Sequence, residues 1–428
     1  MANEKIEKYN FSPKPLKPSK FWMWLARNFA IAPRLKGRPL TIKKINMEGI
    51  EPPYMLFATH ASMLDFPVMY KAIAPYDANN VVAIDAFRDV GDFIMRKLGC
   101  IPTRKFTKDY HLIRNMCYCA QHYKTVICMY PEARFSLDGT TAYLPESLGK
   151  MCKLLKIPVV VLRMYGVFVM SPQWNKPEQK IPLHAELECV ATAEEVKALP
   201  VEELNARIRT AMQRDDYAWQ KENGIEINNP NRADGLHNIL YRCPHCNTEY
   251  EMYSEGTRLW CNHCGKAWQM SPLSELTAEE GETEFTHIPD WTKWERALVR
   301  EEVRSGQYHF EDEVEVHTLP NAIKFYHHGK GKLVQNLEGT YLECTAYGQE
   351  VKKHWAPTEL ESIHIEYDYP FRKKKYRNCL IGDCVDISTP DESYWLHPVH
   401  GRDRLTKISF ATEEIYELAK EKIRNQEN

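Results

Sequence analysis

One histidine and one aspartate near the start of the chain have the spacing of a general-base pair. His60 follows the apolar residues 54–58, and Asp65 lies five positions further on. If Ser62 caps a helix, the Asp65 carboxylate can fold back and accept the Nδ1–H of the imidazole, which leaves Nε2 free to take a proton. A turn histidine followed by a helix-capping aspartate has the same spacing, so both interpretations stay open for this pair taken alone.

Charged and hydroxyl side chains also follow two other apolar segments. Residues 99–106 place two cations beyond a tight turn, and residues 128–136 place a carboxylate, a guanidinium and a hydroxyl after a predicted strand. Arginine binds phosphate through a bidentate fork and lysine binds it as a point charge. Solvent exposure explains each cation taken alone, and only their placement beside the His60 segment indicates a site. The candidate binding residues are Thr103, Arg104, Lys105, Glu132, Arg134 and Ser136.

Four cysteines in the middle of the chain form two C-x2-C pairs separated by residues 247–260. This spacing presents four thiolates to one Zn²⁺ in a tetrahedron, and Gly265 permits the backbone turn that such a site needs. Four thiolates leave no open coordination position, so we predict a structural zinc ribbon over residues 236–270. We expect His245 and His263 to be exposed neighbours of the ligands, which are Cys243, Cys246, Cys261 and Cys264.

Predicted strands and helices alternate through the part of the chain that must position the first two groups of residues. Strands are expected at 40–47, 54–58, 80–84, 125–129, 159–162 and 185–191, with helices beginning near Ser62, Gly91, Asp109 and Pro145. This alternation predicts an α/β domain over residues 37–225, with a central, mostly parallel sheet flanked by helices. A further amphipathic helix is expected at 201–219.

The composition of the chain changes after residue 225. Residues 225–235 are polar and rich in turn formers, which is typical of a linker, and an acidic spacer at 275–284 follows the cysteine module. We predict a mainly-β domain at 285–428, in which short strands, the last at 405–410, precede a closing helix at 412–423. The basic run 371–377 fits either contact with anionic headgroups or a solvated hairpin.

Composition and the N-terminal segment limit the kind of partner. The 428 residues carry 56 Lys and Arg against 58 Asp and Glu, a net charge of -2, so no global field attracts nucleic acid or a membrane. The 13 cysteines are an odd number, and several lie in apolar runs, which is typical of reduced thiols in the cytosol. Residues 1–36 lack the core of a signal peptide, and their tryptophans and cations predict either an interfacial helix or a helix packed on the domain.

The order and spacing of four segments resemble the sequence blocks of the glycerolipid acyltransferase superfamily, typified by 1-acylglycerol-3-phosphate acyltransferase. The segments are T-H-x4-D at 59–65, the turn at 99–106, Y-P-E-A-R-F-S at 130–136 and the Pro-containing apolar strand at 157–161. The resemblance covers about residues 40–190. Together with the zinc ribbon that follows, these segments look like a bacterial branch of the superfamily. The chain departs from the family pattern at Thr59, where Asn is usual, at Ala133, where Gly is usual, and at Arg134, which comes one position early with Phe135 in the usual Arg place.

The resemblance implies transfer of a fatty acyl group from acyl-CoA or acyl carrier protein to a lysophospholipid, foremost 1-acylglycerol-3-phosphate, in phospholipid biosynthesis. It assigns His60 as the general base and Asp65 as the residue that orients it. A thiol leaving group with a pKa of about 8.5 needs little acid assistance, so one base suffices. The implied location is the cytoplasm, with peripheral contact at the inner face of the cell membrane.

The resemblance also implies how the acceptor is held. Arg104, Lys105 or both, together with Arg134, would bind its phosphate, and Thr103 belongs to the same binding segment. Glu132 would orient one of these cations or an acceptor hydroxyl, and Ser136 would position its loop.

Two other functions stay open. The chain could be a non-catalytic scaffold that binds a lipid or a protein through the zinc ribbon and the C-terminal domain, although the intact His60–Asp65 pair argues against this. Alternatively, the chemistry is kept and the acceptor is a glycolipid or an amino-lipid, as the altered segment 131–136 allows. Nucleic acid is not expected as a partner, because residues 234–270 are not especially basic.

Overall fold

A computed structural model describes residues 6–175, 178–369, 382–401 and 404–427, which fall into two compact units. The first unit comprises Met1–Pro172, Glu178–Ile225 and Pro320–Lys324, and the second comprises Gln173–Pro177, Glu226–Leu319 and Phe325–Asn428. The finer division into 1–36, 37–225, 236–270 and 285–428 stays a prediction. The basic run 371–377 lies outside the described residues.

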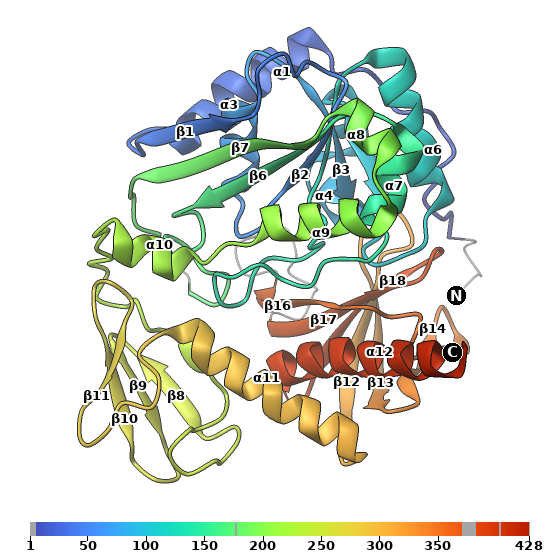
Figure 1. Cartoon of the computed structure of the whole chain (residues 1–428). Coiled ribbons are helices and arrows are strands. Elements are labelled where there is room, and N and C mark those ends of the chain that lie inside the picture. The colour runs from blue at the N-terminus through green and yellow to red at the C-terminus, as the bar shows by residue number, and fades with distance from the viewer. Residues whose placement is uncertain (1–5, 176–177, 370–381, 402–403, 428) are drawn as a thin grey trace. The chain divides into compact units, whose positions relative to one another are not determined.

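The first unit is built on a seven-stranded sheet in which only the pair β6 and β7 is antiparallel (Figure 1). In spatial order the strands are β1 (Leu40–Ile45), β7 (Leu183–Ala191), β6 (Val159–Tyr165), β2 (Met55–Ala58), β5 (Val126–Met129), β3 (Ala78–Ala83) and β4 (Ile101–Thr103). The predicted α/β domain with a mostly parallel sheet is therefore confirmed. Because β6, β2, β5, β3 and β4 run parallel, the segments that follow these five strands leave the sheet at one edge.

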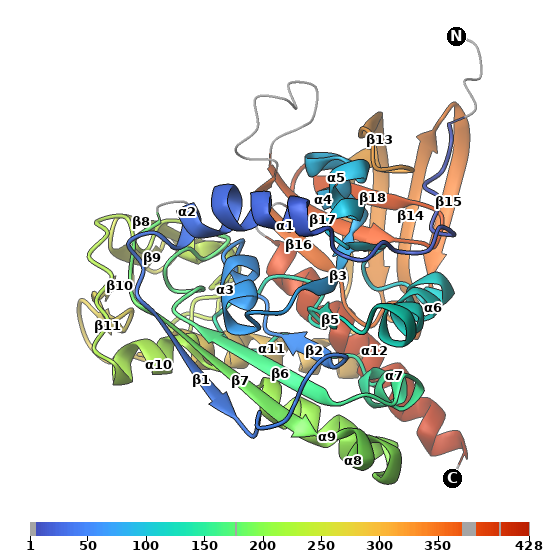
Figure 2. The ribbon, with the colours of Figure 1, turned by 90° about the horizontal axis from the view of Figure 1, so that it is seen from above.

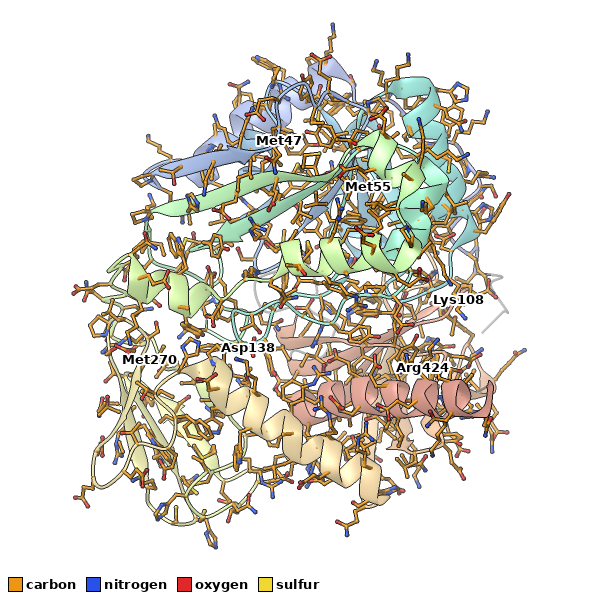
Figure 3. The ribbon with its side chains drawn as sticks, viewed as in Figure 1. Met47, Met55, Lys108, Asp138, Met270 and Arg424 are labelled. Carbon is orange, nitrogen blue, oxygen red and sulfur yellow. The ribbon has the colours of Figure 1, made fainter. Side chains whose placement is uncertain are left out.

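The central strands of this sheet are buried on both faces, as expected of apolar runs in a parallel sheet. All four residues of β2 are buried, including Met55, which Figure 3 labels. Helices cover the two faces, with α3 on one side of the sheet and α8 and α9 on the other (Figure 2). Leu204 and Ile208 of α9 join Phe57 and Val161 in one apolar cluster, so burial of these side chains fixes the helix on the sheet.

The helices of the first unit are short, and several begin at a capping side chain. Asp109 accepts from the backbone N–H of Leu112 at the start of α6, and Thr192 and Glu195 form a capping box at the start of α8. The helices are α1 (Lys20–Ala26), η1 (Arg27–Ile31), α2 (Ala32–Leu35), α3 (Asp65–Ala72), α4 (Ile84–Val90), α5 (Asp92–Lys97), α6 (Tyr110–Tyr118), η2 (Cys119–Tyr123), α7 (Leu148–Leu155), α8 (Ala193–Ala198), α9 (Val201–Met212) and α10 (Asp216–Glu222). Within the described parts of the chain, every helix is too short or too polar to cross a bilayer.

The single helix predicted at 201–219 is two helices. α9 ends at Met212, and α10 begins at Asp216 after the Asp215 side chain accepts from the N–H of Ala218 at 2.9 Å. A capping aspartate competes with helix continuation by offering the backbone a local acceptor, which explains the break. The short segment between the two helices carries Arg214, whose side chain contacts the backbone of His60.

Buried cysteines of the first unit pack as apolar side chains. Burial raises the pKa of the Cys100, Cys119 and Cys152 thiols to about 12. These thiols therefore stay protonated at neutral pH.

The second unit contains two antiparallel sheets, which confirms the predicted zinc ribbon and mainly-β region as a fold class. The smaller sheet consists of β11 (Leu276–Ala278), β10 (Ala267–Met270), β9 (Arg258–Cys261) and β8 (Met252–Glu255), and the short helix η3 (Leu236–Asn238) precedes it. The larger sheet consists of β15 (Gln349–Trp355), β14 (Gly339–Ala346), β13 (Tyr326–Asn336), β12 (Phe310–Thr318), β18 (Ser393–Pro398), β17 (Gly382–Ser388) and β16 (His364–Tyr369).

Two long helices complete the second unit. α11 (Ile288–Ser305) and α12 (Leu405–Glu427) are joined by ion pairs from Arg296 and Arg300 to Glu413 and Glu414. The strand predicted at 405–410 is wrong, because these residues form the start of α12. Leu405, Ile408, Ala411 and Ile415 are all buried, and their spacing of three to four residues is that of one helical face.

Candidate active site

His60 and Asp65 meet at the end of the central strand β2. The His60 Nδ1 lies 2.8 Å from the Asp65 Oδ2, and the same oxygen accepts from the backbone N–H groups of Ala61 and Ser62 at 2.6 and 3.0 Å. Asp65 is the first residue of α3 and is only 1% exposed, whereas the His60 side chain is 25% exposed. The same aspartate oxygen therefore caps the turn and pairs with the imidazole. An ionised carboxylate only accepts, so the proton of the ring lies on Nδ1 and Nε2 can act as a base.

Two aromatic rings flank the imidazole. The ring centroids of Tyr130 and Phe135 lie 4.6 and 4.4 Å from that of His60. Burial raises the pKa of Tyr130 well above its usual value, so this phenol stays neutral beside the histidine. Both rings pack against the imidazole. Sequence reasoning assigned them no role, although both belong to the segment 130–136 that it singled out.

Glu132 binds the backbone of the site. Its Oε1 accepts from the N–H of His60 at 2.8 Å, and its Oε2 accepts from the N–H of Ala142 at 2.8 Å. The side chain is fully buried, and this burial raises its pKa, while Arg214 and the two backbone donors act in the opposite direction. Both carboxylate oxygens thus accept from backbone N–H groups, and the predicted contact of Glu132 with a substrate-binding cation or an acceptor hydroxyl stays a prediction.

The rest of the segment after β5 forms a tight loop around His60. Ala133 has a φ of 50°, in the left-handed region, and its N–H donates to the carbonyl of Tyr130 at 3.1 Å. A glycine would adopt this conformation without the strain that the β-carbon of an alanine brings. Ser136 donates its N–H to the His60 carbonyl at 2.9 Å and its hydroxyl to the Thr140 carbonyl at 2.6 Å. Arg134 is 4% exposed.

The predicted residues at the end of β4 lie at the same edge of the sheet, with β3 and β5 between β4 and β2. Arg104 is 4% exposed, donates from Nη2 to the Pro320 carbonyl at 3.0 Å and lies over the Phe11 ring. Lys105 forms an ion pair of 3.1 Å with Asp85 of α4, and the Thr103 hydroxyl lies 3.4 Å from Asp109 at the start of α6. The structure therefore joins His60, Asp65, Glu132 and Ser136 by direct hydrogen bonds, while the substrate-binding roles of Thr103, Arg104, Lys105 and Arg134 stay predictions.

Sequence reasoning missed Arg214. Its side chain is fully buried, its Nη2 donates to the His60 carbonyl at 3.3 Å, and its Nη1 lies 3.7 Å from Asp216 Oδ2. Residue 214 was expected within a continuous helix, and helical periodicity gives no reason to place such a residue against His60. A capping signal at Asp215 was present in the sequence and would have revealed the break.

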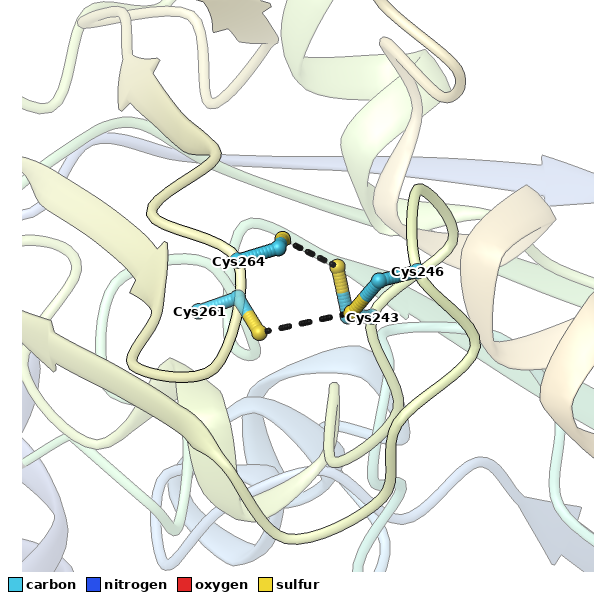
Figure 4. Close-up of side chains that lie close together, drawn as sticks. All are labelled: Cys243, Cys246, Cys261 and Cys264. Atoms are coloured by element: carbon cyan, nitrogen blue, oxygen red, sulfur yellow. Dashed lines mark hydrogen bonds between the residues drawn. The ribbon is translucent and has the colours of Figure 1, made fainter.

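The four cysteines of the second unit converge on one point (Figure 4). The sulfurs of Cys243 and Cys264 lie 3.8 Å apart, those of Cys246 and Cys261 lie 3.7 Å apart, and all four lie within 4.8 Å of one another. Four sulfurs at about 2.3 Å from a tetrahedral Zn²⁺ would be about 3.8 Å apart, so the cluster fits this ion. Gly265 has a φ of 78°, as its predicted turn requires.

Comparison with known proteins bears on the first unit. Residues 41–165 match the model of the family described as Acyltransferase, which confirms the resemblance drawn from the sequence blocks. No curated protein matches the chain. Among solved structures the chain is similar to the 1-acyl-sn-glycerophosphate (LPA) acyltransferase PlsC from Thermotoga maritima, with 14% identity, coverage of 45% of this chain and 84% of that chain, and a TM-score of 0.35. His60, Asp65 and Glu132 lie within the matched residues, and Arg214 lies beyond them.

Proposed function

We propose that this protein is an O-acyltransferase that works at a membrane surface, and the match of residues 41–165 to the acyltransferase family model supports this proposal. It moves a fatty acyl group from acyl-CoA or acyl carrier protein to a lysophospholipid, with 1-acylglycerol-3-phosphate the foremost acceptor. The observation that carries the proposal is the hydrogen bond of 2.8 Å between His60 Nδ1 and Asp65 Oδ2 at the end of β2.

The reaction needs one base and no covalent enzyme intermediate. His60 Nε2 takes the proton of the acceptor hydroxyl while the oxygen attacks the thioester carbonyl, and Asp65 stabilises the imidazolium that forms. A C–O bond forms and the C–S bond breaks, and the proton then passes from His60 to the departing thiolate. Tyr130 and Phe135 keep the imidazole in the orientation that this transfer requires.

An anionic headgroup would be bound by cations at the same edge of the sheet. Arg134 belongs to the loop that surrounds His60, so we place it nearest to the reacting hydroxyl. Arg104 and Lys105 follow β4, and they would exchange the Pro320 carbonyl and Asp85 for phosphate oxygens on binding. If the acceptor is a glycolipid or an amino-lipid, its headgroup would not displace these partners, and Arg104 and Lys105 would stay bonded to the Pro320 carbonyl and Asp85.

An apolar surface near the site would contact the membrane. Phe21, Trp24 and Phe29 on α1 and η1 are 61%, 56% and 70% exposed, and Met63, in the turn between His60 and Asp65, is 66% exposed. Arg34 of α2 donates to the Met63 carbonyl at 3.0 Å, which ties this helical segment to the turn. Exposed aromatic rings with nearby cations are typical of helices that lie in the headgroup layer. We therefore place the protein in the cytoplasm at the inner face of the cell membrane.

The four-cysteine cluster would hold a structural Zn²⁺. Its four thiolates complete a tetrahedral shell, so the ion would stabilise the second unit and take no part in acyl transfer.

The proposal is tested by mass spectrometry of the lipid products after the protein is incubated with mixed lysolipids and two acyl donors. We expect a diacyl product with the wild type and loss of more than about 99% of turnover in His60→Ala, since a general base and its orientation contribute at least 10²-fold. His122→Ala is the matched control, because His122 is exposed on η2. Full turnover in His60→Ala would refute the assignment of the base, and no product from any lysolipid together with tight liposome binding would favour the scaffold.

A further inference from the structure

Two buried side chains, Arg214 and Asp216, lie beside the segments that follow the three central strands of the first unit. Arg214 contacts the carbonyl of His60, which follows β2, and it lowers the pKa of Glu132, which follows β5. Its neighbour Asp216 accepts from the N–H groups of Gly166 and Phe168, which follow β6. β6, β2 and β5 are adjacent in the sheet. One Arg-x-Asp segment, which runs from Arg214 after α9 to Asp216 at the start of α10, therefore connects all three loops.

Both backbone polar groups of His60 are hydrogen-bonded in this arrangement. Its N–H donates to Glu132, and its carbonyl accepts from the N–H of Ser136 and from Arg214 Nη2. The backbone N–H of Arg214 in turn donates to the Thr141 hydroxyl at 3.0 Å, one residue before Ala142, whose N–H donates to Glu132. The chain around Arg214 thus closes a ring of hydrogen bonds that begins and ends at His60.

The charges in this ring depend on one another. Arg214, Glu132 and Asp216 are all fully buried, and a buried carboxylate is costly unless a cation or several donors accompany it. Burial raises the pKa of Asp216 to about 6, and Arg214 and three backbone N–H groups act against that rise. A structural arginine that only closed a loop would not need to face two carboxylates and the carbonyl of the proposed base.

We propose that Arg214 is a positioning residue for acyl transfer: its hydrogen bonds to the His60 carbonyl and to Thr141, beside the Glu132 contacts, keep the imidazole aligned with the acceptor hydroxyl. The inference rests on the proposed function, and it adds a residue that lies outside the part of the chain matched by the family. It acts through His60 and does not touch the substrate.

The test compares Arg214→Gln, Arg214→Lys and the matched control Arg207→Gln. Arg207 lies on α9 of the same unit, is partly exposed and pairs with Glu195 and Glu203, so its replacement removes the same charge outside the ring. We expect Arg214→Gln to lower kcat by about 10- to 100-fold with KM within about twofold of the wild type, because alignment is lost and binding is kept. Arg214→Lys keeps the charge without the guanidinium fork and should fall between the two.

The pH profile separates positioning from simple loss of structure. Without its cation, Glu132 takes a proton at a higher pH, and one of the two N–H groups it accepts from loses its acceptor. The acid limb of kcat/KM should therefore move to higher pH in Arg214→Gln but remain near the wild-type position in Arg214→Lys and Arg207→Gln. Hydrogen exchange of the His60 and Ala142 amides, measured without substrate, should be faster in Arg214→Gln alone.

The variants distinguish a failure of the inference about Arg214 from a failure of the proposed function. If His60→Ala is inactive while Arg214→Gln matches Arg207→Gln in kcat, pH profile and exchange, the inference about Arg214 is wrong and the proposed function stands. If His60→Ala is fully active, the proposed function fails, and unchanged exchange in Arg214→Gln would then overturn the positioning role as well. If Arg214→Gln does not fold, Arg214→Lys decides: a wild-type kcat would show that the guanidinium hydrogen bond to His60 has no effect.

Discussion

A single oxygen atom organises the His60 turn. Asp65 Oδ2 accepts from the imidazole and from two backbone N–H groups, so the orientation of the proposed base and the path of the chain into α3 depend on the same carboxylate. The neighbouring loop after β5 follows the same principle, because Glu132 uses both oxygens to hold peptide groups. Rigid backbone support of this kind is what lets a side chain hold one geometry at a reacting centre.

The left-handed residue in the loop after β5 gives a prediction at this scale. Ala133 has a φ of 50°, where a β-carbon is strained and glycine is not. Ala133→Gly should therefore raise the free energy of unfolding by about 1 kcal/mol, measured by urea denaturation, with turnover maintained. In the control Ala206→Gly, on the exposed face of α9, glycine should lower stability by about 1 kcal/mol. Equal destabilisation by both changes would contradict the strain at Ala133.

At the level of the elements, the sequence predicted those parts of the fold whose signal is local. Strands expected at 54–58 and 125–129 appear as Met55–Ala58 and Val126–Met129, because short apolar runs in a parallel sheet need no partner to be recognised. The contact of Arg214 with His60 joins residues more than 150 positions apart and has no local signal. The same holds for Arg104, which sequence order placed with the substrate-binding residues and the structure bonds to Pro320. The four cysteines were found because their ligand spacing is itself local.

A group of histidines in the large sheet of the second unit predicts that acid destabilises this sheet. The ring of His317 on β12 is buried, with His327 of β13 and His397 of β18 at centroid distances of 4.7 and 5.3 Å. Burial first, and then the neighbouring histidines, lowers the pKa of His317 to about 3 and that of His328 to about 4. Glu315 pairs with His327 and Thr318 with His328, which leaves these two rings hydrogen-bonded.

The sign of the resulting pH dependence follows from linkage. In the unfolded chain the His317 imidazole binds a proton below a pH of about 6.5, whereas in the folded sheet it binds one only near pH 3. The free energy of unfolding is therefore highest above about pH 6.5 and falls as the pH decreases towards 3. At pH 5, His317 alone should cost about 2 kcal/mol of unfolding free energy. His317→Leu should flatten the dependence between pH 7 and 5, measured by hydrogen exchange in β12 and β18. The exposed control His309→Leu should keep it, and a wild-type slope in His317→Leu would disprove the role of this ring.

At the scale of the whole molecule, each unit combines segments distant in sequence. Residues 320–324 belong to the first unit although they lie between β12 and β13, and the carbonyl of Pro320 accepts both from Arg104 and from the N–H of Tyr9. In the second unit, the cysteine cluster is part of the unit's framework. Arg242, next to Cys243, donates its N–H to the buried Glu295 of α11, and the Trp291 indole of α11 donates to the Arg242 carbonyl.

Removal of a Zn²⁺ held by the four cysteines should therefore destabilise the second unit. The packing of Trp268 of β10 against Trp291 of α11, with ring centroids 5.0 Å apart, connects the small sheet to this helix. Cys261→Ser, or chelation, would leave thiolates facing one another without a cation, so α11 and the small sheet should lose protection from hydrogen exchange. Strands β2 and β5 should keep theirs, because their core consists of residues of the first unit. Cys384→Ser, which removes a buried thiol outside the cluster, is the control for lost packing.

Elemental analysis should find about one equivalent of zinc in the wild type and far less in Cys261→Ser. Equal protection of α11 from hydrogen exchange in both proteins would show that the cluster does not stabilise this unit.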